Sequence, residues 1–440
     1  MPKQFDLILK GGLVVNQDGQ GLRDIGVIAG KIAAIGNLSA ATAPEILDCR
    51  NLTILPGVID SQVHFREPGA THKEDLETGS RGAVAGGVTA VFEMPNTKPT
   101  TTTAEALADK VSRASNRMFC DFAFYVGGTR ENVAEISKLE KLPGSAGIKV
   151  FAGSSTGDLL VEDNAGLDAI ISHLSRRAAF HSEDEFRLRA RVGEQRAGDA
   201  SSHPVWRDAE AARLSTERLL KLASKHHKRI HVLHISTAEE LPLLADNRQY
   251  ATVEVTPHHL TLTVDDYARL GTKLQMNPPV REAHHKEALW AAIHNGLVDV
   301  LGSDHAPHTL EEKAKPYPQS PSGMTGVQTL VPIMLDHVNK GRLSLERFVD
   351  LTSHGPNRIF NMAGKGRIAL GYDADFTIVD MQRSAVIQNS WIESRAGWTP
   401  YDGVKVMGWP VGTIVRGHKA MWQGEIASQA QGAAVRFQES

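Results

Sequence analysis

The feature that most constrains the fold of this chain is a regular alternation of short apolar segments with helix-like segments. Apolar segments, each predicted to be one strand, occur at 54–59, 88–92, 147–151 and 299–302, and helix-like runs such as 104–114 and 209–223 lie between them. This alternation is typical of parallel sheets whose strands are connected by helices. It extends over about 300 residues, which fits a (β/α)₈ barrel with insertions. We therefore predict a TIM-like barrel over residues 55–366.

A doubly wound open sheet is the competing architecture for such an alternation. That fold usually carries a glycine-rich phosphate-binding loop after its first strand. Neither G-x-G-x-x-G nor G-x-x-x-x-G-K-[ST] occurs in such a place in this sequence. The barrel is favoured, and its active site should collect residues from the carboxyl ends of several strands.

The two ends of the chain contain short strand-like segments without the helical stretches of the middle. Short β-like segments occur at 6–9, 13–15 and 26–28, with Gly11-Gly12 and residues 29–31 as predicted turns, and similar segments recur at 374–379 and 411–417. We predict that residues 1–54 and 367–440 pair into one β-sandwich domain that flanks the barrel.

Composition excludes several classes of partner. The formal net charge is only -3, and no basic run is interleaved with aromatic residues, so no nucleic-acid surface is expected. No segment approaches the roughly 20 apolar residues that span a bilayer, and the first residues lack the apolar stretch of a signal peptide. The two cysteines, Cys49 and Cys120, form no disulfide framework. A cytoplasmic protein with a small-molecule substrate is expected.

Polar side chains cluster where the predicted barrel strands end. Taken singly, each has an ordinary explanation: a histidine there is often solvated, Lys149 could reach solvent, and Asp304 could cap a turn. Imidazole and carboxylate groups nevertheless suit zinc and similar divalent ions, and a barrel would bring the whole set together. The residues concerned are Asp60, Gln62, His64, Arg66, Asn96, Lys149, His181, His234, Asp304 and His308.

The order and spacing of these motifs closely resemble the amidohydrolase superfamily, and specifically dihydroorotases of the long bacterial type. The resemblance covers nearly the whole chain and implies a barrel flanked by a β-sandwich built from both termini. It is carried by PGVIDSQVHFREPG (56–69), EMPNT (93–97), GIKVF (147–151), HSEDE (181–185), HVLHIS (231–236), VTPHHL (255–260), MNPPVR (276–281) and SDHAPH (303–308).

The resemblance implies a zinc centre with one or two ions. His64 corresponds to a ligand on the first strand, and Lys149 to a bridging lysine that reacts with carbon dioxide to give a carbamate. His181 and His234 correspond to ligands of a second ion. Asp304 corresponds to the aspartate of the last strand, which binds metal and transfers the proton.

One position departs from the family pattern. The first strand of these proteins usually carries His-x-His, whereas this chain has Gln62-Val63-His64. A glutamine offers only an amide oxygen and cannot replace an imidazole ligand. The site is therefore expected to hold one metal ion, or two with one held loosely.

Other positions bear on the substrate. In similar proteins, Arg66, Asn96 and His308 would hold the carboxylate of dihydroorotate, and Asn277 would contact its ring. The implied reaction is the reversible cyclisation of N-carbamoyl-L-aspartate to L-dihydroorotate in de novo pyrimidine biosynthesis, with Asp304 as the proton-transfer group.

Two further hypotheses stay open. One is another cyclic amidase, such as an allantoinase-like enzyme. The other is a catalytically impaired homologue that serves as a structural partner of aspartate transcarbamoylase, and Gln62 is the feature that favours it. A homodimer is the expected assembly. Residues 309–326 are rich in Lys, Pro, Ser and Gly and are predicted to be a long loop, either a lid or a plain insertion.

Overall fold

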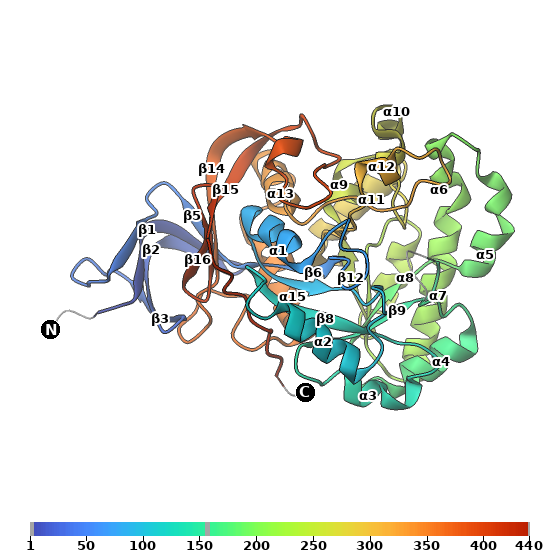
Figure 1. Cartoon of the computed structure of the whole chain (residues 1–440), viewed down its shortest axis with the longest axis horizontal. Helices are drawn as coiled ribbons and strands as arrows, with labels where there is room; N and C mark the ends of the chain where they lie inside the picture. Colours follow the sequence, from blue (N-terminus) through green and yellow to red (C-terminus); the bar gives the residue numbers. More distant parts are fainter. Residues whose placement is uncertain (1–3, 155–158, 439–440) are drawn as a thin grey trace.

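The computed structural model describes residues 4–154 and 159–438 and divides the chain into a barrel and a second sheet (Figure 1). Eight parallel strands form one sheet in the order β13-β12-β11-β10-β9-β8-β7-β6. Val63 of β6 bridges to His305, which follows β13, and His64 N donates to His305 O at 2.7 Å, so the two edges of the sheet approach each other and the barrel is nearly closed. The predicted (β/α)₈ barrel is confirmed. Its strands are β6 (Val58–Val63), β7 (Val88–Glu93), β8 (Asp121–Gly127), β9 (Ser145–Phe151), β10 (Ala178–His181), β11 (Ile230–Val232), β12 (Ala251–Val255) and β13 (Val300–Leu301).

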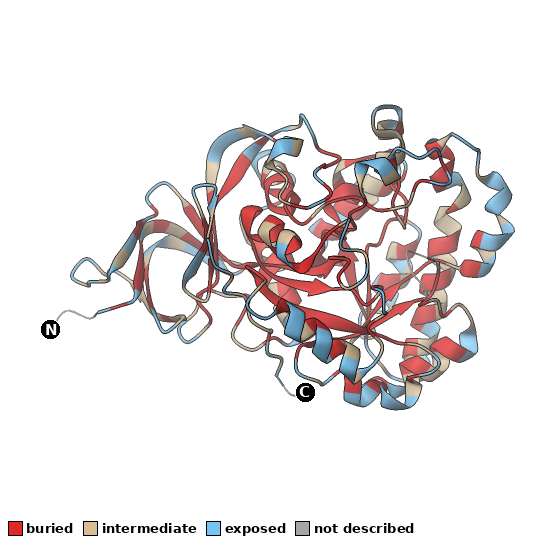
Figure 2. Cartoon of the chain, in the orientation of Figure 1, coloured by how far each residue is buried: buried red, intermediate tan, exposed pale blue. Residues whose placement is uncertain are grey.

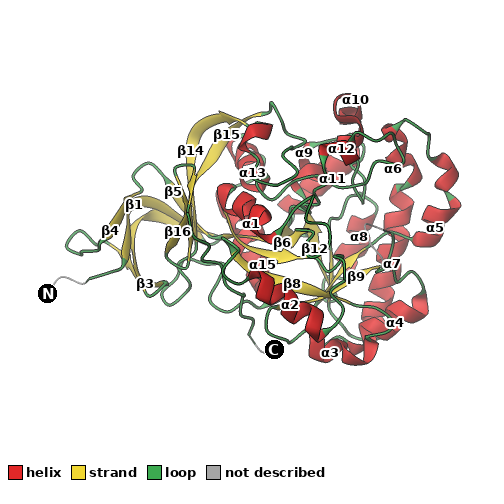
Figure 3. Ribbon diagram, in the orientation of Figure 1, coloured by secondary structure: helices red, strands yellow, loops and turns green. Residues whose placement is uncertain are grey.

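Helices surround the barrel on its outside, as Figure 3 shows. Side-chain caps begin many of them: Asp75 accepts from Thr78 N at the start of α1, and Asp208 accepts from Ala211 N at the start of α7. The helices are α1 (Leu76–Ala85), α2 (Ala104–Ala114), α3 (Ile136–Leu139), α4 (Asn164–His173), α5 (Glu185–Ala190), α6 (His203–Trp206), α7 (Ala209–Lys225), α8 (Glu240–Asp246), α9 (Pro257–Thr261), α10 (Tyr267–Leu270), α11 (Ala283–His294), α12 (Leu310–Lys313), α13 (Leu330–Asn339), α14 (Leu345–Val349) and α15 (Gly355–Phe360). No helix in the described ranges is long and apolar enough to cross a membrane.

Both ends of the chain contribute to the second sheet, as the sequence predicts. β5 from the N-terminal part pairs antiparallel with β14 from the C-terminal part, with Thr377 opposite Leu55. The result is one connected sheet of nine strands. They are β1 (Leu7–Asn16), β2 (Gly19–Ile28), β3 (Lys31–Gly36), β4 (Glu45–Asp48), β5 (Thr53–Pro56), β14 (Phe376–Val386), β15 (Lys405–Val415), β16 (His418–Trp422) and β17 (Glu425–Ile426).

Two local predictions in this region are wrong. Gly11-Gly12 is not a turn: β1 runs through it with a register shift between Leu9 and Gly12, and Gly11 takes a φ of +74° that suits glycine in a bulge. The apolar run 54–59 is also not one strand. It is divided at Gly57, where a Cβ atom would lie 2.2 Å from Thr89 Oγ1, so β5 joins the terminal sheet and β6 the barrel.

Buried side chains fill the barrel, and the end of the chain packs against it. Figure 2 shows the barrel strands buried along their length, while the outer faces of the surrounding helices are exposed. The barrel interior is filled by apolar side chains that include Phe92 and Tyr125, and Phe360 packs edge-on against both of them. The end of the chain also reaches the barrel, since Val435 N donates to Phe122 O at 2.8 Å. The division of the chain at 54/55 and 366/367 stays a prediction.

Candidate active site and metal centre

A narrow pocket lined mostly by polar side chains lies at the carboxyl ends of the barrel strands. In a (β/α)₈ barrel this is the end where active sites form. The side chains that line it come from β6, β9 and β10 and from the segments after β6, β11, β12 and β13. They are Gln62, His64, Arg66, Lys149, Phe151, His181, His234, Met276, Asn277, Asp304, Ala306, Ser322 and Gly323.

The structure brings all of the predicted site residues together. The five predicted metal ligands and two of the predicted substrate contacts, Arg66 and Asn277, line the pocket itself. The other two lie directly beside it: His308 Nε2 is 3.3 Å from Arg66 Nη2, and Asn96 Oδ1 is 2.8 Å from His64 Nδ1. The structure thus places these residues close together, while their roles in metal and substrate binding stay predictions.

His181 and His234 form one half of the candidate metal centre. His181 Nδ1 and His234 Nε2 are 3.0 Å apart at the ends of β10 and β11. His181 Nε2 is 2.9 Å from Glu183 Oε2, so the proton belongs on Nε2 and leaves the Nδ1 lone pair facing His234. Burial lowers the pKa of both histidines, which keeps the imidazoles neutral as metal ligation requires.

Lys149 lies on β9 and lines the same pocket as the two histidines. Its Nζ is buried, and no residue of the described ranges gives it a hydrogen bond. Burial lowers the pKa of Lys149 to about 7, against the opposing effect of the carboxylates of Asp304 and Glu254. A buried amine that is neutral for much of the time near neutral pH has the reactivity that carbamate formation needs.

Asp304, His64 and Gln62 form the other half. Asp304 Oδ1 accepts from Gln62 Nε2 at 3.0 Å and lies 3.2 Å from His64 Nε2. Burial, reinforced by the charge of Glu254, raises the pKa of Asp304 to about 7. A carboxyl group with this pKa can accept and release a proton near neutrality. The donor set of both halves, imidazole nitrogens with a carboxylate and an orphaned amine, fits a zinc centre.

Backbone strain is concentrated at this site. Arg66, His234 and Asp304 have φ values of +62°, +39° and +47°, in the left-handed region that side chains other than glycine rarely adopt. Such strain persists only where the surrounding structure holds it. Here it turns three functional side chains toward one pocket.

Arg66, with His308 beside it, forms one wall of the pocket. Its positive charge comes from Arg66, because burial lowers the pKa of His308 to about 3 and keeps that imidazole neutral. Arg66 Nε donates to Pro307 O at 3.2 Å, which fixes the guanidinium group, and the side chain is buried. Burial lowers the pKa of Arg66 to about 10, so it stays charged at neutral pH. Lys73 lies on the other side of His308 and donates from Nζ to His308 Nδ1 at 3.1 Å. This wall suits an anionic group of a substrate.

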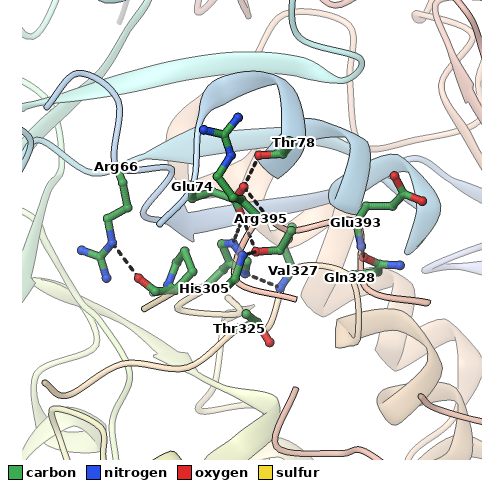
Figure 4. A network of polar contacts seen from close by, with 12 residues as sticks. Arg66, Glu74, Thr78, His305, Thr325, Val327, Gln328, Glu393 and Arg395 are labelled. Atoms are coloured by element: carbon green, nitrogen blue, oxygen red, sulfur yellow. Dashed lines mark hydrogen bonds and ion pairs between the residues drawn. The ribbon is translucent and has the colours of Figure 1, made fainter. Parts of the chain in front are cut away.

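Residues that sequence reasoning missed hold the predicted ones in place. His305 Nε2 lies 3.3 Å from Glu74 Oε2, and its Nδ1 accepts from Gly326 N at 3.0 Å (Figure 4). His305 thus anchors the backbone next to Asp304. Similarly, His203 Nε2 is 2.9 Å from Asn277 Oδ1. His305 was present in the SDHAPH motif, but His203 carries no local signal because its partner is far away in the sequence.

A second cluster of potential ligands, Glu239, His284 and His285, lies near the start of α11. His285 Nδ1 accepts a hydrogen bond from Ala238 N at 3.0 Å. The neutral imidazole therefore carries its proton on Nε2, and neither nitrogen has a lone pair left for a metal.

Comparison with known proteins agrees with this fold and pocket. Family models for the amidohydrolase family and for dihydro-orotase-like proteins match residues 209–420 and 52–146, respectively. The chain belongs to the amidohydrolase family. Its relatives include a dihydroorotase of Halobacterium salinarum, which is 37% identical over 94% of this chain and 97% of its own length. An L-hydantoinase of Paenarthrobacter aurescens is 34% identical over 96% of both chains.

A solved structure supports the same assignment. The L-hydantoinase (dihydropyrimidinase) from Arthrobacter aurescens superposes with a TM-score of 0.94 at 32% identity, covering 98% of this chain and 100% of that chain. The chain is thus a metal-dependent hydrolase of cyclic amides by family, and its similarity to dihydroorotases and to a hydantoinase extends over nearly the full length.

Proposed function

We propose that this chain is a dihydroorotase, which interconverts N-carbamoyl-L-aspartate and L-dihydroorotate in de novo pyrimidine biosynthesis. The observation that carries the proposal is the buried guanidinium group of Arg66, which Pro307 O holds in place 3.3 Å from His308 Nε2, on the same pocket as the candidate metal ligands. A carboxylate on the substrate ring would pair with this fixed charge. A neutral ring such as a hydantoin has no group that needs it.

We further propose that zinc is the metal. His181, His234 and carbamylated Lys149 would hold one ion, and His64 with Asp304 would hold a second ion more weakly, because Gln62 stands where an imidazole is usual. The carbamate would form when the neutral Lys149 amine attacks carbon dioxide and releases one proton. When bound, zinc lowers the pKa of water and polarises a carbonyl group.

The residues of the chain supply binding and proton transfer. In the hydrolytic direction, Asp304 would accept a proton as water attacks the ring amide and would deliver it to the leaving nitrogen; cyclisation reverses these transfers. Arg66, His308 and Asn96 would hold the substrate carboxylate. Asn277, oriented by His203 at 2.9 Å, would contact the ring.

A hydantoinase is the second candidate function. The similarity to L-hydantoinases, at 34% identity in sequence and a TM-score of 0.94 in structure, favours it. The allantoinase-like alternative shares the metal motifs but is supported by nothing beyond them. The pocket argues against the hypothesis of an impaired homologue. A structural partner of aspartate transcarbamoylase has no need of five potential metal ligands in one pocket, namely His64, Lys149, His181, His234 and Asp304.

The test is a comparison of two substrates on purified protein supplied with zinc and bicarbonate. Wild-type protein is expected to turn over L-dihydroorotate faster than a 5-substituted L-hydantoin. Arg66→Ala should raise KM for dihydroorotate by about 10–100-fold, because a charge-assisted hydrogen bond of about 1.5–3 kcal/mol is lost. The same variant should leave turnover of the neutral hydantoin nearly unchanged.

Arg66→Lys is the matched control, because it keeps the charge and removes the fork of the guanidinium group. Turnover of the hydantoin alone would replace the dihydroorotase proposal by the hydantoinase one. Absence of turnover of both substrates by zinc-loaded protein would overturn the enzymatic proposal as a whole.

The proposal extends to the cellular setting of the protein. We expect a cytoplasmic location, since both cysteines are free thiols buried in the fold and no disulfide links them. A homodimer and an association with aspartate transcarbamoylase stay predictions that rest on the resemblance.

A further inference from the structure

A second hollow, of about 260 Å³, lies at the amino ends of the barrel strands, on the face opposite the candidate active site. Four arginines line it, and no carboxylate side chain of residues 4–154 or 159–438 does. Arg176 and Arg177 directly precede β10, and Arg229 directly precedes β11. The residues that line the hollow are Ala146, Ser175, Arg176, Arg177, Arg229, Arg358, Ile359, Phe360, Asn361, Phe437 and Gln438.

The positive charge of this hollow is poorly compensated. Within the described part of the chain, Arg176, Arg177 and Arg229 form no ion pair with any carboxylate. Arg358 Nη2 is 3.3 Å from Asp299, but the same carboxylate is held at 2.7 Å by Arg248. Several like charges around one acidic group repel one another, and this arrangement costs stability unless an anion is bound.

Hydrogen bonds hold two of the guanidinium groups in place. Arg177 Nη1 donates to Ile230 O and to Thr252 Oγ1, both at 3.2 Å, while its Nε is buried without a partner in the described ranges. Arg176 Nη1 donates to Glu140 O at 3.0 Å, and its guanidinium carbon lies 5.8 Å from the centre of the Phe437 ring. These contacts order the two groups in advance, so that a ligand would not have to order them.

We propose that this hollow binds an oligophosphate anion, that is, a compact ligand with at least two phosphate groups. Guanidinium groups match phosphate oxygens with paired N–H donors, and several of them accumulate where phosphate is recognised. A single carboxylate would neutralise one of the four arginines, whereas a pyrophosphate group would neutralise two or three. The hollow is small and recessed, which fits a small ligand better than an acidic protein segment.

Isothermal titration of the full chain with inorganic pyrophosphate at low ionic strength tests the proposal. Wild-type protein is expected to bind one pyrophosphate per chain, and Arg229→Ala to weaken Kd at least about tenfold, as expected for one charge-assisted contact. Arg229 is exposed and makes no side-chain hydrogen bond or ion pair in the described structure, so its removal should not impair folding. Without pyrophosphate, the Tm of Arg229→Ala should be equal to or above that of wild type, because repulsion is relieved.

Arg383→Ala is the matched control, because Arg383 is also exposed and unpaired in the described structure but lies on β14. It should bind pyrophosphate as wild type does. Both variants should keep the wild-type rate with L-dihydroorotate. The proposal is overturned if millimolar pyrophosphate produces neither heat nor a rise in Tm, or if Arg383→Ala weakens binding as much as Arg229→Ala.

Discussion

Gln62 donates from Nε2 to Asp304 Oδ1 at 3.0 Å, while its buried Oε1 has no hydrogen-bond partner in the described structure. The side chain therefore faces the candidate metal centre through an amide oxygen that is a weaker ligand for zinc than an imidazole nitrogen. A single residue thus separates this chain from the usual His-x-His pattern. Its consequence concerns metal content rather than fold, since the neighbouring His64 and Asp304 keep their places.

Replacement of Gln62 by histidine should restore the missing ligand. We expect Gln62→His to raise the zinc that survives gel filtration by about one ion per chain, since each protein ligand adds to a tetrahedral site. Elemental analysis of wild type and variant, prepared in the same zinc buffer, measures this. Gln62→Asn keeps an amide and should leave the zinc content unchanged. Equal zinc in wild type and Gln62→His would show that this position does not limit metal binding.

At the scale of elements, residues 309–326 begin with the short helix α12 and are held by hydrogen bonds at several points along the segment. Thr309 caps α12, whose last residue, Lys313, is buried and donates from Nζ to Pro321 O at 2.8 Å. Gly323 N donates to Gln275 O at 2.8 Å, so the far side of the loop is fixed as well. Since Ser322 and Gly323 line the candidate active site, this anchoring shapes one wall of the pocket.

Removal of the buried anchor should loosen the loop without unfolding the barrel. Lys313→Met keeps the length of the side chain and removes the donor to Pro321 O. We expect amide hydrogen exchange over residues 316–323 to become about tenfold faster, as expected for loss of one hydrogen bond of roughly 1–2 kcal/mol, and KM for dihydroorotate to rise. The exposed Lys315→Met is the control. Unchanged exchange in Lys313→Met would mean that other contacts hold the loop.

The contact between α9 and α13 gives a prediction on pH. His337 Nε2 on α13 lies 2.9 Å from Thr261 Oγ1, and burial lowers the pKa of His337 to about 4. Below pH 6.5 the unfolded chain binds this proton and the folded chain does not, so stability falls as the pH drops from 6.5 toward 4. The free energy of unfolding of wild type should fall faster than that of His337→Gln, by at most about 1.4 kcal/mol per pH unit. Parallel urea titrations at pH 7, 6 and 5 measure the difference, and equal slopes would contradict a neutral buried His337.

Local signals explain which elements could be predicted from the sequence. The polar residues after the barrel strands were recognisable because Asp304 and His64 directly follow apolar runs, and a barrel gathers such positions. Pairings between distant segments left no such signal. Near-closure of the barrel through Val63 and His305, and the hydrogen bond from His203 to Asn277, join residues 242 and 74 positions apart. Division of the run 54–59 between two sheets depends likewise on the distant strand β14.

On the scale of the whole molecule, a buried cluster of charges joins the barrel to the terminal sheet. Lys365 Nζ lies 2.7 Å from Asp121 at the start of β8 and 2.6 Å from Asp375, just before β14, and it is also 3.2 Å from Asp373. Arg416 Nε adds a second contact to Asp121 at 3.1 Å. Burial alone would lower the pKa of Lys365, but the three carboxylates outweigh it and raise that pKa above its usual value. One ammonium group therefore compensates charges from both parts of the fold.

Loss of this ammonium group should be far more damaging than loss of a surface one. Lys365→Met would leave the buried Asp375 without its counter-charge and Asp121 with Arg416 alone, and breaking a buried pair in this way costs about 3–5 kcal/mol. Lys340→Met is the matched control, because Lys340 is 62% exposed and its bond to Asp336 at 2.6 Å belongs to a surface pair, worth about 0–1 kcal/mol. Urea unfolding at pH 7.5 measures both. If the two variants lose similar stability, apolar contacts hold the barrel and the terminal sheet together, and the ion pairs of Lys365 add little to the free energy of unfolding.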